Sequence, residues 1–206
     1  MKIGILAVQG DFEAHAAMLA RLGIDYVFVR TPRDLEGVDG VILPGGESTT
    51  QWKFLVEEGL DKALTEHASR GGAIFGTCAG AILLAREARN PEQPSLGLAD
   101  ISVIRNAYGR QLASDVRHGK TSLSPEPVEM VFIRAPIIER VGPGVEVLAT
   151  SEGQPVLIRE GRILIATFHP ELTSDAAVHR YFLGMISGNG ASPRLNDPML
   201  KTASSR

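Results

Sequence analysis

The single cysteine of this chain lies in a pattern that suits a nucleophile. Residues 73–84 read AIFGTCAGAILL, an apolar strand, a G-x-C-x-G turn and an apolar helix. Gly76 and Gly80 lack Cβ atoms where strand and helix crowd together, so we expect Cys78 on a strained turn with its thiol exposed. Amide groups at a helix start stabilise a thiolate, and the N–H of Ala79 can bind an oxyanion. The alternative, a small core residue, leaves the flanking glycines unexplained.

His169 is the histidine best placed to move the proton. It follows the apolar run 163–168 and precedes Pro170 and Glu171. Side chains two residues apart in extended chain point the same way, so Glu171 can accept the imidazole N–H and set its tautomer. The other histidines are interpreted as structural: His15 and His67 as solvated or half-buried helix residues, His118 as a polar loop residue, and His179 as a residue of the last helix.

A pair of glycines after another apolar run supplies a second candidate oxyanion donor. Gly45 and Gly46 follow the buried-type strand 41–43, in the sequence PGGESTT. A backbone amide flanked by glycines can approach a substrate oxygen without side-chain interference. The purely structural interpretation is a strand-to-helix turn with Ser48 or Thr49 as the helix N-cap. This interpretation is compatible with a role in binding an oxyanion.

Composition excludes several other classes of function. The 206 residues carry 21 Lys+Arg against 24 Asp+Glu, a net charge of −3, so the basic surface of a nucleic-acid-binding protein is not expected. The apolar N-terminal run is interrupted by Asp11 and Glu13, which argues against a signal peptide or membrane span. One cysteine allows no intrachain disulfide and no CxxC metal pair. We therefore expect a cytoplasmic protein without membrane association.

The alternation of elements predicts an α/β fold in one domain. Short apolar runs alternate with segments of helical spacing, which favours a mostly parallel sheet with helices on both faces. In this half, the expected strands are residues 3–8, 26–29, 41–43 and 73–75, and the expected helices 12–22 and 55–68. Later runs at hairpin-like intervals predict mixed or antiparallel strands at 101–104, 130–133, 145–150, 155–159 and 163–168, before a helix at 175–186. The polar tail 188–206 is expected to be flexible.

The motifs together resemble a known enzyme family. PGGEST, FGTCAG and FHPEL, in this order and spacing, resemble the class I (triad) glutamine amidotransferases. IGILAVQGDFEAH, RNAYGRQ and VFIRAP add similarity to the members that serve as glutaminase subunits of pyridoxal 5′-phosphate synthases. The resemblance covers about residues 1–187. It implies a three-layer, flavodoxin-like fold and a partner, the synthase subunit, that receives ammonia.

The resemblance also assigns roles to residues. It implies Cys78 as nucleophile, His169 as acid and base, and Glu171 as its orienting group. Gly46 and Ala79 are implied as oxyanion donors, and no metal or cofactor is implied. The residues implied to bind L-glutamine are Gly46, Glu47, Ser48, Arg105, Ile133 and Arg134.

Two other classes of function remain as alternatives. Thiol hydrolases of the stress-protein kind share the G-x-C-x-G turn but can take their histidine from beside the cysteine, where this chain has Ala79. A binding module with Cys78 as a redox sensor has no use for Glu171 or Arg134. Glutaminase assays with and without a synthase partner discriminate among the three.

Overall fold

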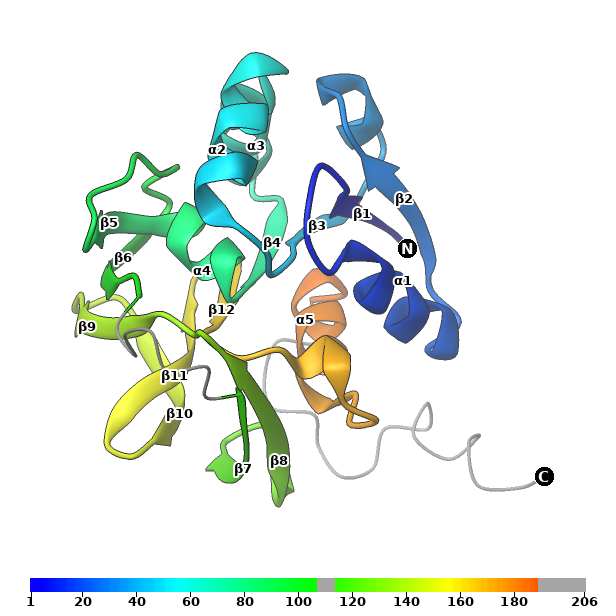
Figure 1. Cartoon of the computed structure of the whole chain (residues 1–206). Helices are drawn as coiled ribbons and strands as arrows, with labels where there is room; N and C mark the ends of the chain where they lie inside the picture. Colours follow the sequence, from blue (N-terminus) through cyan, green and yellow to red (C-terminus); the bar gives the residue numbers. More distant parts are fainter. Residues whose placement is uncertain (107–113, 189–206) are drawn as a thin grey trace.

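The computed structural model describes residues 1–106 and 114–188 (Figure 1). Its first half contains β1 (Lys2–Leu6), α1 (Phe12–Arg21), β2 (Asp25–Val29), the 3-10 turn η1 (Pro32–Leu35), β3 (Gly40–Leu43), α2 (Ser48–Glu57), α3 (Leu60–Ser69), β4 (Ala73–Thr77) and α4 (Ala79–Leu84). Its second half contains β5 (Ala85–Arg89), β6 (Ala99–Ile104), β7 (Ser114–Thr121), β8 (Ser124–Ile133), β9 (Ile137–Val141), β10 (Glu146–Ser151), β11 (Gln154–Glu160), β12 (Ile163–Ala166), η2 (Pro170–Leu172) and α5 (Ala177–Ile186). The RNAYGRQ run from residue 107 on, and the tail from residue 189 on, lie outside the described residues.

A nine-stranded mixed sheet forms the centre, in the order β2-β1-β3-β4-β12-β11-β10-β7-β8. The first five of these strands are parallel, with Ile163 opposite Ile74 where β12 joins β4. From β12 onward every neighbour is antiparallel. The carboxyl ends of the five parallel strands therefore share one edge, the usual place for a site in an α/β sheet.

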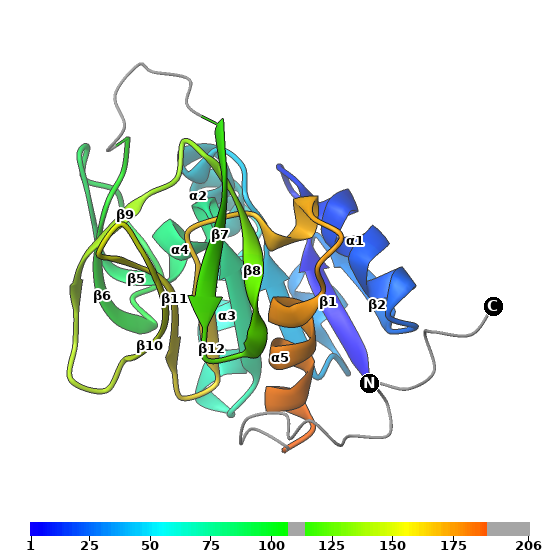
Figure 2. The same ribbon diagram turned by 90° about the horizontal axis from the view of Figure 1, so that it is seen from below.

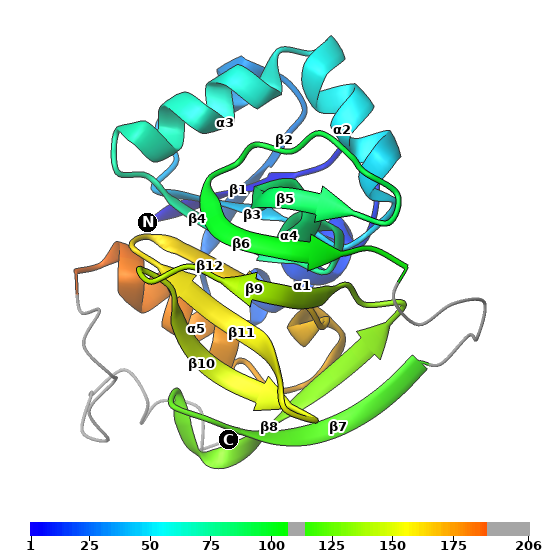
Figure 3. The ribbon, with the colours of Figure 1, turned by 90° about the vertical axis from the view of Figure 1, so that its left-hand side faces the viewer.

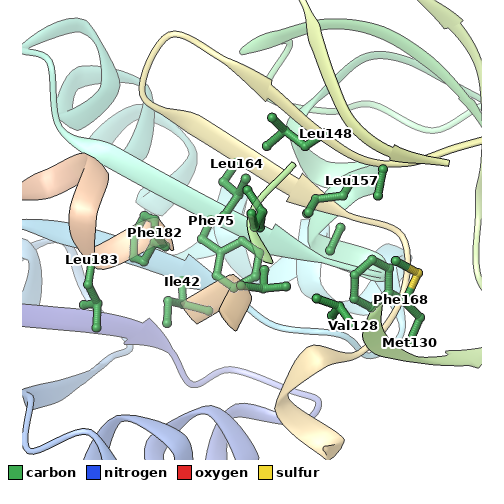
Figure 4. Packing of buried hydrophobic residues seen from close by; sticks show 14 of the residues in the cluster. Ile42, Phe75, Val128, Met130, Leu148, Leu157, Leu164, Phe168, Phe182 and Leu183 are labelled. Atoms are coloured by element: carbon green, nitrogen blue, oxygen red, sulfur yellow. The ribbon is translucent and has the colours of Figure 1, made fainter. Parts of the chain in front are cut away.

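Two apolar clusters cover the two faces of the parallel half. On one face, Leu19 of α1 and Phe182 of α5 pack against Ile42 and Phe75, and the two helices lie close together in Figure 2. On the other face, α2, α3 and α4 bring Leu55, Leu64 and Leu83 against the alternate strand residues. Figure 4 shows the first cluster continuing from Phe182 to Phe168 under the antiparallel strands. Runs of fully buried strand residues fit this two-sided burial.

A small second sheet, β5-β6-β9, closes the side of α4 (Figure 3). Its strands β5 and β6 are parallel, and β9 runs antiparallel to β6. Ile101 and Val103 of β6 and Ile138 of β9 belong to the same cluster as Leu83 and are fully or almost fully buried. Helix α4, which begins directly after Cys78, is thus enclosed on the face away from the main sheet.

The α/β class and the mixed sheet are confirmed, with three differences of detail. The expected helix 55–68 is two helices, α2 and α3, because Gly59 takes a left-handed φ of 72° between them. Strands β5, β7 and β9 were not predicted. His118 lies in β7 and not in a loop. No helix in the described ranges is both long and apolar enough to cross a membrane.

Candidate active site

Cys78 lies at the strained junction between β4 and α4, as predicted. Its φ is +47°, and its N–H donates to the Ala166 carbonyl at 2.9 Å. A Cβ at Gly80 would lie 2.1 Å from the Leu43 carbonyl oxygen, so the close approach of α4 to β3 requires glycine there. The expectation of an exposed thiol is wrong, because only 7% of Cys78 is exposed.

The strand end that lies beside the Cys78 thiol belongs to β8. The Sγ of Cys78 lies 3.8 Å from the carbonyl oxygen of Ile133, the last residue of that strand. Arg134 follows with a φ of +47° and an exposed side chain. The Ile133–Arg134 pair is therefore beside the thiol, where the resemblance places part of the glutamine site.

His169 and Glu171 form a buried hydrogen-bonded pair at the end of β12. His169 Nδ1 lies 2.8 Å from Glu171 Oε1, and both side chains are almost completely buried. Pro170 begins the turn η2 and fixes the chain between them. This contact sets the proton on Nδ1 and leaves Nε2, which is also buried, for the thiol.

The charges of this pair are set by its surroundings. Burial lowers the pKa of His169, but its interactions with Cys78 and Glu171 outweigh burial and raise it to about 10. Burial raises the pKa of Glu171, but His15 and His169 outweigh it and hold this pKa well below its usual range. The site therefore favours the charged forms of both residues, an imidazolium beside the Cys78 thiol and a carboxylate behind the imidazolium. This arrangement is suited to activating a cysteine.

Two further histidines lie in the core behind Glu171 and Thr77. The expectation that His15 is solvated or half-buried is wrong, since His15 and His179 are both fully buried. His15 Nε2 lies 3.1 Å from Thr77 Oγ1 and 3.5 Å from Glu171 Oε1, and its Nδ1 lies 3.0 Å from His179 Nε2. The signal in the sequence is that His15 shares the apolar face of α1 with Leu19. Thr77 was also missed, although it is the one polar residue in β4.

Gly45, the first residue of the Gly45–Gly46 loop, is hydrogen-bonded to two neighbours, Thr77 and Asp11. Gly45 donates its N–H to Thr77 Oγ1 at 3.1 Å and accepts the Asp11 N–H at 3.0 Å. A Cβ on Gly45 would lie 2.3 Å from His169 Cε1, and one on Gly46, where φ is +152°, would lie 2.4 Å from Gln9 Oε1. Both positions therefore require glycine, in line with a backbone that approaches the reacting atoms closely.

The helix that follows the loop begins differently from the expectation. Its N-cap is Glu47, not Ser48 or Thr49: the Glu47 carboxylate accepts the N–H groups of Thr49 and Thr50 at 3.0 and 2.7 Å. Burial raises the pKa of Glu47, but these bonds and that of the Thr50 hydroxyl outweigh it and lower it to about 2. Ser48 is buried and donates to Gln93 at 2.9 Å. Both side chains are thus engaged within the protein.

Arg105, which follows β6, reaches the start of the same helix. Its Nη2 donates to Thr49 Oγ1 at 2.9 Å and its Nη1 to the Pro91 carbonyl at 3.2 Å. The residue is buried, and its Nε has no hydrogen-bond partner among the described residues. Arg105 therefore lies close to Glu47, whose charge raises its pKa, although burial lowers it more.

One group of side chains has the composition of a metal site. Ligand atoms of Asp11, His169 and Glu171 lie within 4.8 Å of one another. Two of the three are already paired by the 2.8 Å bond between His169 and Glu171. The group thus belongs to the same cluster of side chains as Cys78, His169 and Glu171.

Comparison with known proteins decides the family. The model of the SNO glutamine amidotransferase family matches residues 5–187. This chain belongs to that family. The comparison accordingly supports the glutamine amidotransferase resemblance over the redox-sensor and stress-protein alternatives.

Relatives in the family match the chain over nearly its whole length. The pyridoxal 5′-phosphate synthase subunit PdxT of Koribacter versatilis is 53% identical over 193 residues, covering 92% of this chain and 98% of the relative. PdxT of Thermotoga maritima is 49% identical over 187 residues, covering 90% and 100%. A crystal structure of a glutamine amidotransferase, 47% identical, has a TM-score of 0.85 and covers 90% of this chain and 98% of that one.

More distant structures share the fold alone. A glutamine amidotransferase from Thermotoga maritima is 13% identical with a TM-score of 0.59, covering 92% of this chain and 83% of that one.

Proposed function

We propose that Cys78, His169 and Glu171 are the catalytic triad with which this chain carries out the reaction of its family. The chain is a glutaminase: it hydrolyses L-glutamine and supplies the ammonia for pyridoxal 5′-phosphate synthesis. The observation that supports the triad most is the buried 2.8 Å bond between His169 and Glu171, at the strand end next to the strained cysteine.

The reaction follows from the charges of the site. The Cys78 thiolate attacks the side-chain carboxamide carbon of glutamine, and a C–S bond forms as the carbonyl oxygen becomes an oxyanion. The N–H groups of Gly46 and Ala79 bind that oxyanion. His169 protonates the leaving nitrogen, the C–N bond breaks, and ammonia and a γ-glutamyl thioester remain. Water, deprotonated by His169, then attacks the thioester and releases glutamate and the thiolate.

The substrate site is assembled from three strand ends. We propose that glutamine is held by Gly46, Glu47 and Ser48 after β3, by Arg105 after β6, and by the Ile133–Arg134 pair at the end of β8. Arg134 is exposed and directly follows Ile133, whose carbonyl oxygen lies 3.8 Å from the Cys78 thiol, and Arg105 is the buried arginine that reaches the start of α2. A guanidinium matches a carboxylate in a bidentate way, so these arginines suit the α-carboxylate of a free amino acid.

The partner is the synthase subunit, with which the chain forms a hetero-oligomer. We propose that it docks on the loop 9–11 and on α1. This loop supports the oxyanion loop directly: Asp11 N–H donates to Gly45, and Gln9 Oε1 accepts from Glu47 N at 2.7 Å. A partner that moves the loop 9–11 therefore moves the Gly45–Gly46 peptide. The ammonia is passed through the interior of the complex, where it stays uncharged and nucleophilic.

The finer description of the fold and the cellular location belong to the same proposal. We propose a three-layer, flavodoxin-like arrangement in one domain over residues 1–187. A glutaminase that feeds a biosynthetic synthase works in the cytoplasm, where a single free cysteine stays reduced.

Glutamate release tests the proposed function. The wild-type chain is assayed with glutamine alone and with the synthase subunit, beside Cys78→Ala in the same mixtures. We expect glutamate from the wild-type mixture with synthase and none above background from Cys78→Ala. Absence of glutamate in every wild-type mixture contradicts the function, and equal release by Cys78→Ala contradicts the role of the cysteine.

A further inference from the structure

A row of hydrogen bonds extends from the triad into the core on the side away from the nucleophile. Thr77 Oγ1 lies 3.4 Å from Glu171 Oε1 and 3.1 Å from His15 Nε2. His15 Nδ1 in turn lies 3.0 Å from His179 Nε2. All four side chains are buried, and they come from α1, β4, η2 and α5. Two histidines in an apolar core at this depth need a reason beyond packing.

The direction of each bond follows from the carboxylate of Glu171. An ionised carboxylate only accepts hydrogen bonds, so the Thr77 hydroxyl donates to it. The lone pairs of Thr77 Oγ1 then accept from the Gly45 N–H and from His15 Nε2. His15 therefore carries its proton on Nε2, and its Nδ1 accepts the Nε2–H of His179.

A doubly protonated His15 would leave a buried N–H donor of His179 without an acceptor. If His15 carried protons on both nitrogens, His179 would have to carry its own proton on Nδ1. That atom is buried and has no hydrogen-bond partner among the described residues. A lone pair in such a place is tolerated better than an N–H group. Burial is the largest cause that lowers the pKa of His179, to about 3, which agrees with a neutral ring.

We propose that His15, held in one tautomer by His179, is a positioning residue of the glutaminase site. It fixes the Thr77 hydroxyl, which in turn holds Glu171 and the Gly45 amide. The inference rests on the proposed function of the triad, because it concerns how the triad is kept in place. A carboxylate that loses this support can turn away from His169, and small displacements of catalytic groups are costly to the rate.

The structure offers substitutions that separate hydrogen bonding from packing. His15→Leu and His179→Phe remove hydrogen bonds and keep apolar volume. His15→Gln and His179→Gln return an amide nitrogen the same number of bonds from the backbone as Nε2. Phe75→Leu is the matched control, because the Phe75 ring packs edge-on against both histidines, with centroids 6.0 and 5.5 Å away, and forms none of these hydrogen bonds.

The experiment measures kcat and KM for glutamine in each variant, in complex with the synthase subunit, together with its Tm. We expect kcat to fall about tenfold or more in His15→Leu and His179→Phe, with KM little changed. Recovery to within about threefold is expected in the two glutamine variants, and Phe75→Leu should lower Tm while keeping kcat within about threefold.

Ring nitrogen chemical shifts of His15 supply a readout that packing does not move. In the wild-type chain we expect the proton on Nε2, and in His179→Phe a mixture of tautomers. The inference is overturned if folded His15→Leu keeps the wild-type kcat, if Phe75→Leu loses as much activity as His179→Phe, or if the wild-type proton lies on Nδ1. A wild-type complex without glutaminase activity contradicts the proposed function itself, whereas the tautomer can be read in either case.

Discussion

The backbone N–H of Gly45 donates to the side-chain oxygen of Thr77 at 3.1 Å. Thr77 is the residue before the nucleophile, and Gly45 begins the pair of glycines that precedes α2. The same hydroxyl lies within 3.4 Å of Glu171 Oε1. The Gly45–Gly46 loop and the proposed triad are therefore joined through the side chain of Thr77, so a displacement of one is expected to displace the other.

The first prediction concerns control of activity by the partner. We expect the isolated chain to be nearly inactive, and the synthase subunit to activate it by turning the Gly45–Gly46 peptide so that its N–H faces the oxyanion. This rotation has to break the 3.0 Å bond from Asp11 N–H to Gly45. A missing oxyanion donor costs about 10²- to 10³-fold in rate. Full activity of the isolated chain, unchanged by synthase, rules this mechanism out.

Substitution of Gly46 tests the same loop. In Gly46→Val the new Cβ meets Gln9 Oε1 at 2.4 Å and the φ of +152° is strained. We expect synthase to leave this variant inactive, while its thiol still reacts with an alkylating glutamine analogue. Gly71→Ala is the control, since it also has a positive φ but open space, at the opposite end of β4. Activation of Gly46→Val to the wild-type level argues against a peptide rotation.

Loss of each triad member should have a graded effect. Cys78→Ala and His169→Asn are expected to lower kcat by about 10³-fold or more, because each removes a group that takes part in bond making. Glu171→Ala is expected to cost less, since water can replace part of an orienting carboxylate. Circular dichroism checks that the fold is kept. An effect of Cys78→Ala below about tenfold is incompatible with a nucleophile.

Replacement of the two arginines should separate binding from chemistry. Arg105→Met and Arg134→Met are each expected to raise KM for glutamine by about tenfold or more, because a charged hydrogen bond to the carboxylate is lost. Arg105→Met also removes the 2.9 Å bond to Thr49, so we expect it to lower Tm as well, unlike Arg134→Met. If both variants keep the wild-type KM, the assignment of these arginines to the substrate is wrong.

Stability should fall on mild acidification because of His179. Burial is the largest cause that lowers its pKa from 6.5 to about 3; the charge of Arg21 adds to this shift and that of Glu171 opposes it. Between these values the unfolded chain binds a proton that the folded chain excludes. The free energy of unfolding therefore decreases as pH falls through this window, by about 1.4 kcal/mol per pH unit for this group.

Urea unfolding at several values between about pH 7.5 and about pH 5 measures this slope. His179→Gln, which cannot titrate, should show a shallower decrease than the wild-type chain. Equal slopes in the two proteins place the titrating group elsewhere.

The elements that carry the nucleophile could be predicted because their signals are local. The strand, the turn around Cys78 and the short helix follow from glycines flanking one cysteine, and the end of β12 from an apolar run before His169. Strand β7 escaped prediction because its sequence, SDVRHGKT, has no apolar face, and its side chains alternate between exposed and half-buried.

The residues that hold the site in place could not be predicted, because their positions depend on contacts between distant parts of the chain. The burial of His15 and His179 depends on α1 and α5 packing on the same face of the sheet, a contact between residues 164 positions apart. Likewise, Glu47 became the N-cap because its carboxylate reaches the amides of Thr49 and Thr50, whereas Ser48 turned to Gln93 on a distant loop. Such choices are decided by tertiary contacts and leave little trace in local sequence.

The central claim is that Cys78 carries the glutamyl group during turnover. The complex with the synthase subunit is mixed with glutamine, quenched in acid within one turnover and digested. Mass spectrometry then measures the mass of the peptide that contains residue 78. We predict a γ-glutamyl thioester on Cys78 in the wild-type chain, lost when the sample is treated with hydroxylamine, and no adduct in Cys78→Ala. Glutamate release by the wild-type complex with no adduct on Cys78 at any quench time, and undiminished release by Cys78→Ala, would contradict the account.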